Sequence, residues 1–183
     1  LVEALPADGV AVLNADDPAV LAMRDRTRAR VVTTGRGPAD VRAVDVHTDR
    51  GRARFRLVTP HGDAPVALQL YGEHHVDNAL AAAAVALELG ASPAQVAEAL
   101  SAATPVSRWR MEVTDRPDGV TVINDSYNAN PESMLAALRS LISIGAGRRT
   151  WAVLGRMAEL GDAASAAHAE IAAQAQALGI DRL

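Results

Sequence analysis

Residues 120–144 combine a short apolar run, a polar loop and the start of a helix in direct succession. The run Val120–Ile123 predicts a strand, and the Leu- and Ile-rich segment 135–144 predicts a helix. Asn130 is a favoured N-cap residue, and Pro131 suits the first helical turn because that position needs no backbone donor. A strand that leads through a loop into a capped helix is typical of α/β folds, so we expect that fold class.

The polar loop, Asn124–Met134, has two interpretations. A helix N-terminus presents free amides and favours anions, which makes the loop a candidate nucleotide or phosphate site. Asn, Asp, Ser and Pro are also the residues of ordinary turns. The local chemistry leaves both interpretations open.

The composition excludes several kinds of chemistry. All 18 basic residues are arginine and there is no cysteine, so the chain has no lysine clamp for phosphate, no disulfide and no thiol nucleophile. A formal charge of −4, without a dense basic cluster, argues against nucleic-acid binding. The apolar run Ala79–Leu87 is too short to span a bilayer. We expect a cytoplasmic protein without membrane insertion.

The first part of the chain predicts a strand–helix unit followed by an antiparallel patch. Gly9–Leu13 predicts a strand, and Asp17 and Pro18 predict the cap and first turn of the next helix. Alternating apolar residues predict further strands, the last three joined by glycine-containing turns as hairpins. These strands cover Val31–Thr33, Val41–His47, Ala53–Val58 and Val66–Leu70.

Two helices follow the strands. Ala79–Leu89 carries apolar residues on one face and is ended by Gly90, and Ser92–Gln95 has a capping-box pattern. We place a domain boundary after Pro105, where Ala103–Val106 breaks the helical pattern. A loop inside one domain is the alternative.

The second part predicts alternating strands and helices, which favours parallel strands. Trp109–Val113 and Val120–Ile123 predict a hairpin, and Thr150–Leu154 predicts a further strand. Asp162 is predicted to cap a final helix, Ala163–Leu178.

Other chemical signals are weak. Glu73-His74-His75 contains metal-capable groups, but its histidines are adjacent and not one helical turn apart, so we predict no metal site in the chain. The chain contains neither the Gly-x-Ser-x-Gly elbow of hydrolases nor a Gly-x-x-x-x-Gly-Lys phosphate loop.

Three separate patterns resemble the Mur ligase family. Gly72–Asn78, which reads Gly-Glu-His-His-Val-Asp-Asn, is similar to the family's Gly-x-His-Asn-x-x-Asn before an alanine-rich helix. Asp125–Pro131 reads Asp-Ser-Tyr-Asn-Ala-Asn-Pro, and Met157–Gly161 reads Met-Ala-Glu-Leu-Gly. Asn14–Asp17, Asn-Ala-Asp-Asp, resembles a further motif of the family's central domain. The second and third patterns are closest to the branch that adds D-alanyl-D-alanine to the peptidoglycan precursor.

The resemblance covers essentially the whole chain and implies two domains. Residues 1–105 would be the C-terminal part of a central ATP-binding domain, and residues 106–183 the start of a Rossmann-like C-terminal domain. Because the chain begins without methionine, we expect it to be a piece of a longer protein. The family's phosphate-binding loop with its lysine, its magnesium-binding acids and its UDP-sugar domain are expected before Leu1.

Three residues carry the family's nucleotide contacts. Asn78 matches the asparagine that contacts adenine, Asp125 the aspartate that contacts ribose, and Arg108 the catalytic arginine that reaches the nucleotide phosphates. Each has a simpler alternative: a helix cap for Asn78, a loop-stabilising acceptor for Asp125 and a solvated strand residue for Arg108.

Further residues follow from the same motifs. Tyr127, Asn128 and Asn130 are expected to shape the cofactor-binding site, although Asn130 is also explained as a cap. Glu159 is expected on the dipeptide-binding side, and His168 matches a histidine of the following helix.

The sequence also departs from the family at three positions. His75 stands where asparagine is usual, Arg156 where an acidic residue is common, and Ala172 where glycine is expected.

The implied activity is an ATP-dependent amide ligase of peptidoglycan synthesis. It would join D-alanyl-D-alanine to UDP-N-acetylmuramoyl-tripeptide through an acyl phosphate, with ATP and Mg²⁺, as a monomer when full length. The chain alone is expected to be inactive. Two alternatives stay open: another Mur ligase or a folylpolyglutamate-synthase-like ligase with a different amine, and a non-enzymatic α/β interaction module.

Overall fold

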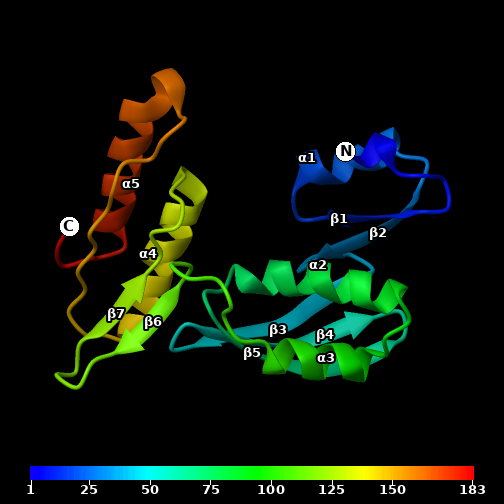
Figure 1. Ribbon diagram of the computed structural model, residues 1–183, viewed down its shortest axis with the longest axis horizontal. Coiled ribbons are helices and arrows are strands. Elements are labelled where there is room, and N and C mark those ends of the chain that lie inside the picture. Colours follow the sequence, from blue (N-terminus) through cyan, green and yellow to red (C-terminus); the bar gives the residue numbers. More distant parts are fainter. The chain divides into compact units, whose positions relative to one another are not determined.

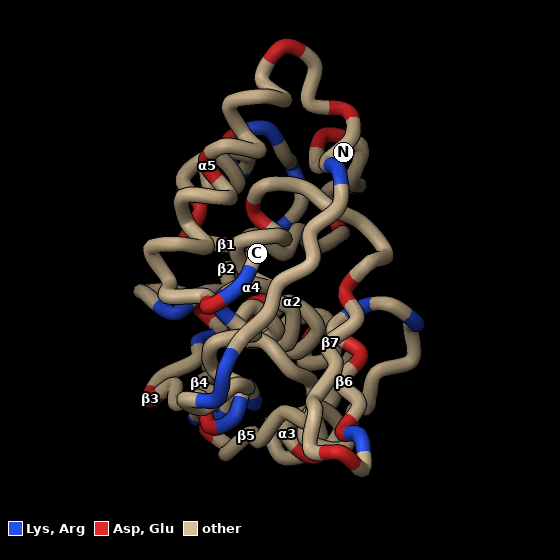
Figure 2. Tube along the Cα trace, turned by 90° about the vertical axis from the view of Figure 1, so that its left-hand side faces the viewer, with Lys and Arg blue, Asp and Glu red and all other residues tan.

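The computed structural model describes residues 1–183, which form two compact units (Figure 1). Arginine and acidic residues are interspersed along the chain (Figure 2), and none of the helices has the length and apolar character that crossing a bilayer requires. The boundary after Pro105 stays a prediction. Unit 1 comprises Leu1–His47, Ala53–Gln69 and His74–Ala103, and unit 2 comprises Thr48–Arg52, Leu70–Glu73 and Thr104–Leu183.

A parallel strand pair begins the sheet. After a short 3-10 turn (Val2–Ala4), β1 (Val10–Asn14) pairs with β2 (Arg30–Gly35) along its full length. Asp17 caps α1 (Pro18–Leu21), because its Oδ1 accepts from the amides of Ala19 (2.8 Å) and Val20 (3.2 Å). The predicted strand, cap and first-turn proline are confirmed. A 3-10 turn, Ala22–Arg26, follows α1.

Three further strands extend this sheet in the order β1-β2-β3-β4-β5. β3 runs parallel to β2, and short turns connect it to β4 and β4 to β5. In the first turn Arg50 and Gly51 both have positive φ, 45° and 81°, as in the two-residue turns that match the twist of a hairpin. The predicted hairpins are confirmed. The strands are β3 (Val41–Asp49), β4 (Arg52–Thr59) and β5 (Gly62–Tyr71).

The apolar side of the sheet packs against α2 (His75–Glu88) and α3 (Pro93–Ala102). Leu57 and Leu80 are essentially inaccessible, and burying such a side chain contributes roughly 1.5–3 kcal/mol. Gly90, with φ of 92°, follows α2, and the Ser92–Gln95 capping box begins α3. The end of α2 and the start of α3 agree with the sequence prediction, whereas α2 begins at His75, before the predicted start at Ala79.

Unit 2 contains a hairpin and two helices. β6 (Glu112–Asp115) pairs antiparallel with β7 (Thr121–Asn124), and α4 (Pro131–Gly145) follows the polar loop. A 3-10 turn, Gly161–Ala163, precedes α5 (Ala164–Ala177). α4 and α5 lie side by side (Figure 1). Their buried cluster is Leu138, Ala152, Met157, Ile171 and Ala175.

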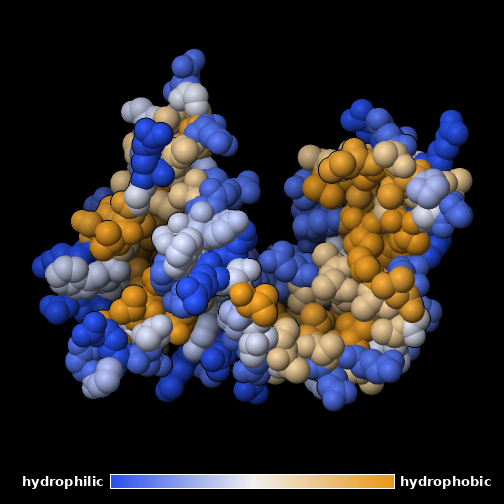
Figure 3. Space-filling model, viewed as in Figure 1, coloured by the Kyte–Doolittle hydropathy of each residue, from blue (hydrophilic) through white to orange (hydrophobic).

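Two predictions about unit 2 are wrong. Thr150–Leu154 is not a strand: it forms only one parallel bridge, Trp151 to Arg182, and Val153 is 96% exposed. A strand requires a partner along its length, and this run has one at a single point. Apolar side chains of this run therefore reach the surface. Apolar patches are also visible elsewhere on the molecular surface in Figure 3. Asp162 is not a cap, because it lies inside the 3-10 turn and α5 has no side-chain cap bond.

The predicted hairpin strand is also shorter than expected. Trp109 and Met111 have positive φ, 63° and 47°, which lies outside the extended region that regular strands occupy. β6 therefore begins only at Glu112.

Candidate functional site

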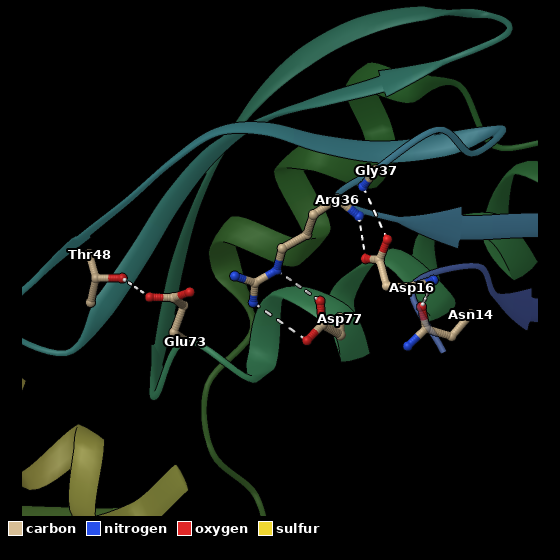
Figure 4. Close-up of polar contacts among 7 residues, drawn as sticks. All are labelled: Asn14, Asp16, Arg36, Gly37, Thr48, Glu73 and Asp77. Atoms are coloured by element: carbon tan, nitrogen blue, oxygen red, sulfur yellow. Dashed lines mark hydrogen bonds and ion pairs between the residues drawn. The ribbon is translucent and has the colours of Figure 1, made fainter. Parts of the chain in front are cut away.

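An aspartate joins the carboxyl ends of β1 and β2 (Figure 4). The Asp16 carboxylate accepts hydrogen bonds from the amides of Arg36 (2.6 Å) and Gly37 (3.1 Å), and the Asp16 amide donates to Asn14 Oδ1 (3.0 Å). Hydrogen bonds to a charged acceptor are stronger than neutral ones. We call this arrangement the Asp16 clamp; it fixes the loops that follow both strands, where parallel α/β sheets commonly bind ligands.

Glycine at position 35 is required for this approach. A Cβ built on Gly35 would lie 2.9 Å from Asp16 Oδ1, and one on Gly37 would lie 3.1 Å from the same atom. Asp16 therefore reaches the amides of Arg36 and Gly37 because residues 35 and 37 have no side chain that would occupy the same space.

Arg36 connects the same loop to the first turn of α2. Its Nε donates to Asp77 Oδ1 (3.1 Å) and its Nη2 to Asp77 Oδ2 (3.4 Å), with side chains 33% and 43% exposed (Figure 4). Such partly exposed pairs contribute about 1 kcal/mol or less, but a two-pronged contact fixes direction. The sequence prediction missed Arg36. The only signal in the sequence was its position between two glycines, Gly35 and Gly37.

Asn78 follows Asp77 on an exposed position of α2. Its Nδ2 has a long contact, 3.5 Å, with Nδ1 of His75. Because Asn78 lies inside α2, whose N-cap is His74 and which has no side-chain cap bond, the alternative that Asn78 is a cap is wrong. Asn78 adjoins the Arg36–Asp77 pair in the sequence, and its carbonyl oxygen accepts no intramolecular hydrogen bond.

His75 is the departure from the family pattern in this turn. Its burial, aided by the neighbouring His74, lowers the pKa of His75 to about 4. His75 is therefore neutral at physiological pH. The nearby Glu73 accepts from the Thr48 hydroxyl (3.2 Å) (Figure 4).

Asp125 follows β7 and binds a strained backbone. Its Oδ1 accepts from the amide of Met111 (2.9 Å), whose φ is 47°. The loop-stabilising alternative for Asp125 is confirmed. The contact engages one carboxylate oxygen, so it does not use up the acceptor capacity of the side chain.

An arginine stacks on the motif tyrosine. The Arg110 guanidinium lies 4.1 Å from the ring centroid of Tyr127, which is 58% exposed, and the Tyr127 amide donates to the Trp109 carbonyl (3.1 Å). Such a cation–π contact orients both groups. Arg108 lies in the irregular segment before β6, is exposed and makes no ion pair, so it is not the strand residue of the simpler alternative. Sequence reasoning missed Arg110.

The other motif asparagines have local bonds. Asn130 caps α4 as predicted: its Oδ1 accepts from the Ser133 amide (2.8 Å), and its own amide donates to Ser133 Oγ (3.0 Å). Asn128 Oδ1 accepts from the Ala129 amide (2.9 Å). Together they shape the loop between Asp125 and α4.

Glu159 projects from a strained loop. It is exposed and has φ of 62°, which is uncommon for a residue other than glycine. Met157, two residues earlier, is buried and its amide donates to Nε2 of His168 (3.0 Å). Arg156 and Ala172, the other departures from the family pattern, are exposed.

Two family models match the chain. The Mur ligase middle domain matches residues 1–86, and the Mur ligase, glutamate ligase domain matches residues 109–183. The chain belongs to the Mur ligase family. The predicted mixed α/β class is confirmed for this Mur ligase chain.

Named relatives cover the whole chain. The UDP-N-acetylmuramoyl-tripeptide–D-alanyl-D-alanine ligase of Mycobacterium tuberculosis (strain ATCC 25618 / H37Rv) is 55% identical over 189 residues, which cover 100% of this chain and 37% of the relative. The crystal structure of MurF from Acinetobacter baumannii is similar with a TM-score of 0.88 and 32% identity, over 97% of this chain and 38% of that one. MurF from Thermotoga maritima, solved in complex with ADP, shares the fold with a TM-score of 0.81 at 22% identity, over 94% and 39%. This Mur ligase chain thus spans little more than a third of these relatives.

The candidate residues are distributed over both units. Asn78 belongs to unit 1, whereas Arg108, Asp125 and Glu159 belong to unit 2.

Proposed function

We propose that the protein containing this chain ligates D-alanyl-D-alanine to UDP-N-acetylmuramoyl-tripeptide with ATP, in the cytoplasm, as a step of peptidoglycan synthesis. The observation that carries the proposal is 55% identity over the entire chain to a relative of that name. The geometry around Asn78, Asp125 and Asn130 supports it, because these residues lie in the first turns of α2, directly after β7 and at the N-cap of α4, and ligands commonly bind at such strand ends and helix starts in α/β folds.

Three residues of the chain would contact the nucleotide. Asn78 Oδ1 would accept from the adenine amino group, and the second oxygen of Asp125 would accept from a ribose hydroxyl. Arg108, exposed and without an ion pair, supplies the cation for the phosphates. Tyr127, Asn128 and Asn130 hold the loop that presents Asp125.

The reaction proceeds in two steps. A carboxylate oxygen of the tripeptide attacks the γ-phosphorus of ATP and ADP leaves, which gives an acyl phosphate. The amine of the dipeptide then attacks the acyl carbon, loses a proton and expels phosphate. Positioning and charge neutralisation supply most of the acceleration in phosphoryl transfer, and Arg108 is the residue of this chain suited to the second task.

In this proposal Mg²⁺ binds together with ATP. No group of three or more His, Cys, Asp or Glu side chains in the structure is arranged to hold a metal ion. We therefore assign the ion no ligand among these residues.

A product assay with the full-length protein tests the proposal. Phosphate release and product mass are measured with ATP and one of three acceptor–amine pairs: UDP-N-acetylmuramoyl-tripeptide with D-alanyl-D-alanine, UDP-N-acetylmuramate with L-alanine, or UDP-N-acetylmuramoyl-L-alanyl-D-glutamate with diaminopimelate. We expect product only with D-alanyl-D-alanine. A preference for another amine would identify a different Mur ligase, and no amine-dependent phosphate release would favour the interaction module.

A further inference from the structure

His168 on α5 makes two hydrogen bonds that only one form of its ring allows. Nδ1 lies 2.7 Å from the Ala164 carbonyl, and Nε2 lies 3.0 Å from the Met157 amide nitrogen. A carbonyl only accepts and an amide N–H only donates, so Nδ1 must carry the hydrogen and Nε2 must be bare. The bonding pattern therefore assigns the neutral Nδ1–H tautomer.

The loop that His168 holds has little other support. Residues 152–160 form no regular structure. Met157 anchors the loop by burying its side chain, at 2% exposure, in the cluster with Leu138 and Ile171. Two residues later the backbone enters the left-handed region at Glu159. A non-glycine residue persists there only when its surroundings impose the conformation.

We propose that His168 is a positioning residue for Glu159: through the Met157 amide it sets the loop shape that presents Glu159 to the dipeptide substrate. The assignment of Glu159 to the dipeptide side rests on the proposed function. His168 itself touches no substrate. Its effect travels through one hydrogen bond and two residues of backbone.

Two substitutions separate the two bonds of the ring. His168→Gln keeps an oxygen at about the reach of Nε2, so it can still accept from the Met157 amide. His168→Asn is shorter; its amide can donate to the Ala164 carbonyl within the helix but does not reach Met157. Each variant thus preserves one bond and serves as the control for the other.

Kinetics of the full-length ligase provide the first measurement. We expect His168→Asn to raise the KM for D-alanyl-D-alanine roughly three- to thirty-fold, the effect of losing one hydrogen bond. The KM for ATP should change by less than about two-fold, and His168→Gln should restore the dipeptide KM to within about three-fold of the wild type.

NMR without substrate provides the second measurement. With ring-¹⁵N histidine, the His168 signal, identified by its loss in His168→Gln, should show the Nδ1–H tautomer. With ¹⁵N methionine, the Met157 amide should be protected from hydrogen exchange in the wild type and in His168→Gln but not in His168→Asn.

The outcomes separate the role from its alternatives. A His168 ring that carries its hydrogen on Nε2, or a Met157 amide equally protected in both variants, would refute the hydrogen bond from the Met157 amide to Nε2. Equal losses of thermal stability in both variants with an unchanged dipeptide KM overturn the positioning role in favour of a purely structural one. Wild-type enzyme that forms no D-alanyl-D-alanine product overturns the proposed function, while the NMR measurements still decide the contact.

Discussion

Replacing Asp16 by asparagine tests the clamp at the carboxyl ends of β1 and β2. The wild-type carboxylate offers one oxygen to the Arg36 amide at 2.6 Å and the other to the Gly37 amide at 3.1 Å. Asparagine has one acceptor oxygen, so its NH₂ group must face a backbone N–H.

The expected loss is one charge-assisted hydrogen bond and the weakening of a second. A hydrogen bond to a charged group contributes about 1.5–3 kcal/mol. Because Asp16 is exposed, screening reduces this, and we expect Asp16→Asn to lower the free energy of unfolding by about 1–2 kcal/mol. In a chain of this size that corresponds to a decrease in Tm of roughly 2–8 °C.

Asp17 provides a matched control. It is the adjacent residue, it is also exposed and its Oδ1 also accepts two backbone amides, but as a helix cap. Asparagine caps helices as well as aspartate does, so Asp17→Asn should change stability by less than about 0.5 kcal/mol.

Circular dichroism and fluorescence together localise the effect. Both tryptophans, Trp109 and Trp151, belong to unit 2, so their fluorescence is an internal reference for a change in unit 1. We expect Asp16→Asn to shift the helix and sheet signal in urea more than the tryptophan signal. Equal destabilisation by the two substitutions, or an unchanged midpoint for Asp16→Asn, would refute the clamp.

Three further predictions concern the nucleotide and pH. In the full-length enzyme, Asp125→Asn keeps an oxygen for the Met111 amide but removes the charged acceptor for ribose. The KM for ATP should therefore rise roughly five- to 150-fold, more than the KM for the dipeptide. Arg108→Ala should instead lower kcat. Steady-state kinetics with both substrates varied check this, and unchanged ATP dependence in the aspartate variant counts against its role. The pKa of His75 is lowered from 6.5 to about 4 by burial first and His74 second, so the folded state binds the proton less readily than the unfolded state: stability is complete above pH 6.5 and should fall by about 1–2 kcal/mol between pH 6.5 and 4, after allowance for partial exposure. The free energy of unfolding, measured by urea titration at each pH in that range, should depend more steeply on pH in the wild type than in His75→Asn. An equal pH dependence in both proteins would exclude His75 as the cause. The 183-residue chain alone should bind magnesium-ATP no more tightly than roughly millimolar, because a triphosphate is held mainly by loop amides, lysine and metal; micromolar binding by calorimetry would reveal a phosphate site that we have not identified.

Helix starts and turns could be predicted from the sequence because their energetics are local. The cap of α1 by Asp17, the Ser92–Gln95 box and the cap of α4 by Asn130 each join residues at most three positions apart. The Asp49-Arg50-Gly51 turn depends in the same way on backbone preferences of adjacent residues. Family motifs predict the candidate site residues for the same reason, since each motif occupies one continuous segment of the chain.

Contacts between distant segments were decided by tertiary structure. The Asp16 clamp joins residues 20 and 21 positions apart, and the Arg36–Asp77 pair joins residues 41 positions apart, and no local pattern in the sequence marks either. The run Thr150–Leu154 is apolar enough for a strand, but a strand exists only where a second segment supplies hydrogen bonds along it, and here Arg182 supplies one bridge. Likewise, Asp162 has a side chain suited to an N-cap. It does not cap a helix, because the 3-10 turn begins one residue earlier, at Gly161, and Asp162 lies inside that turn. A side chain's chemistry can be read from the sequence, whereas its partner depends on which segments the fold brings to it.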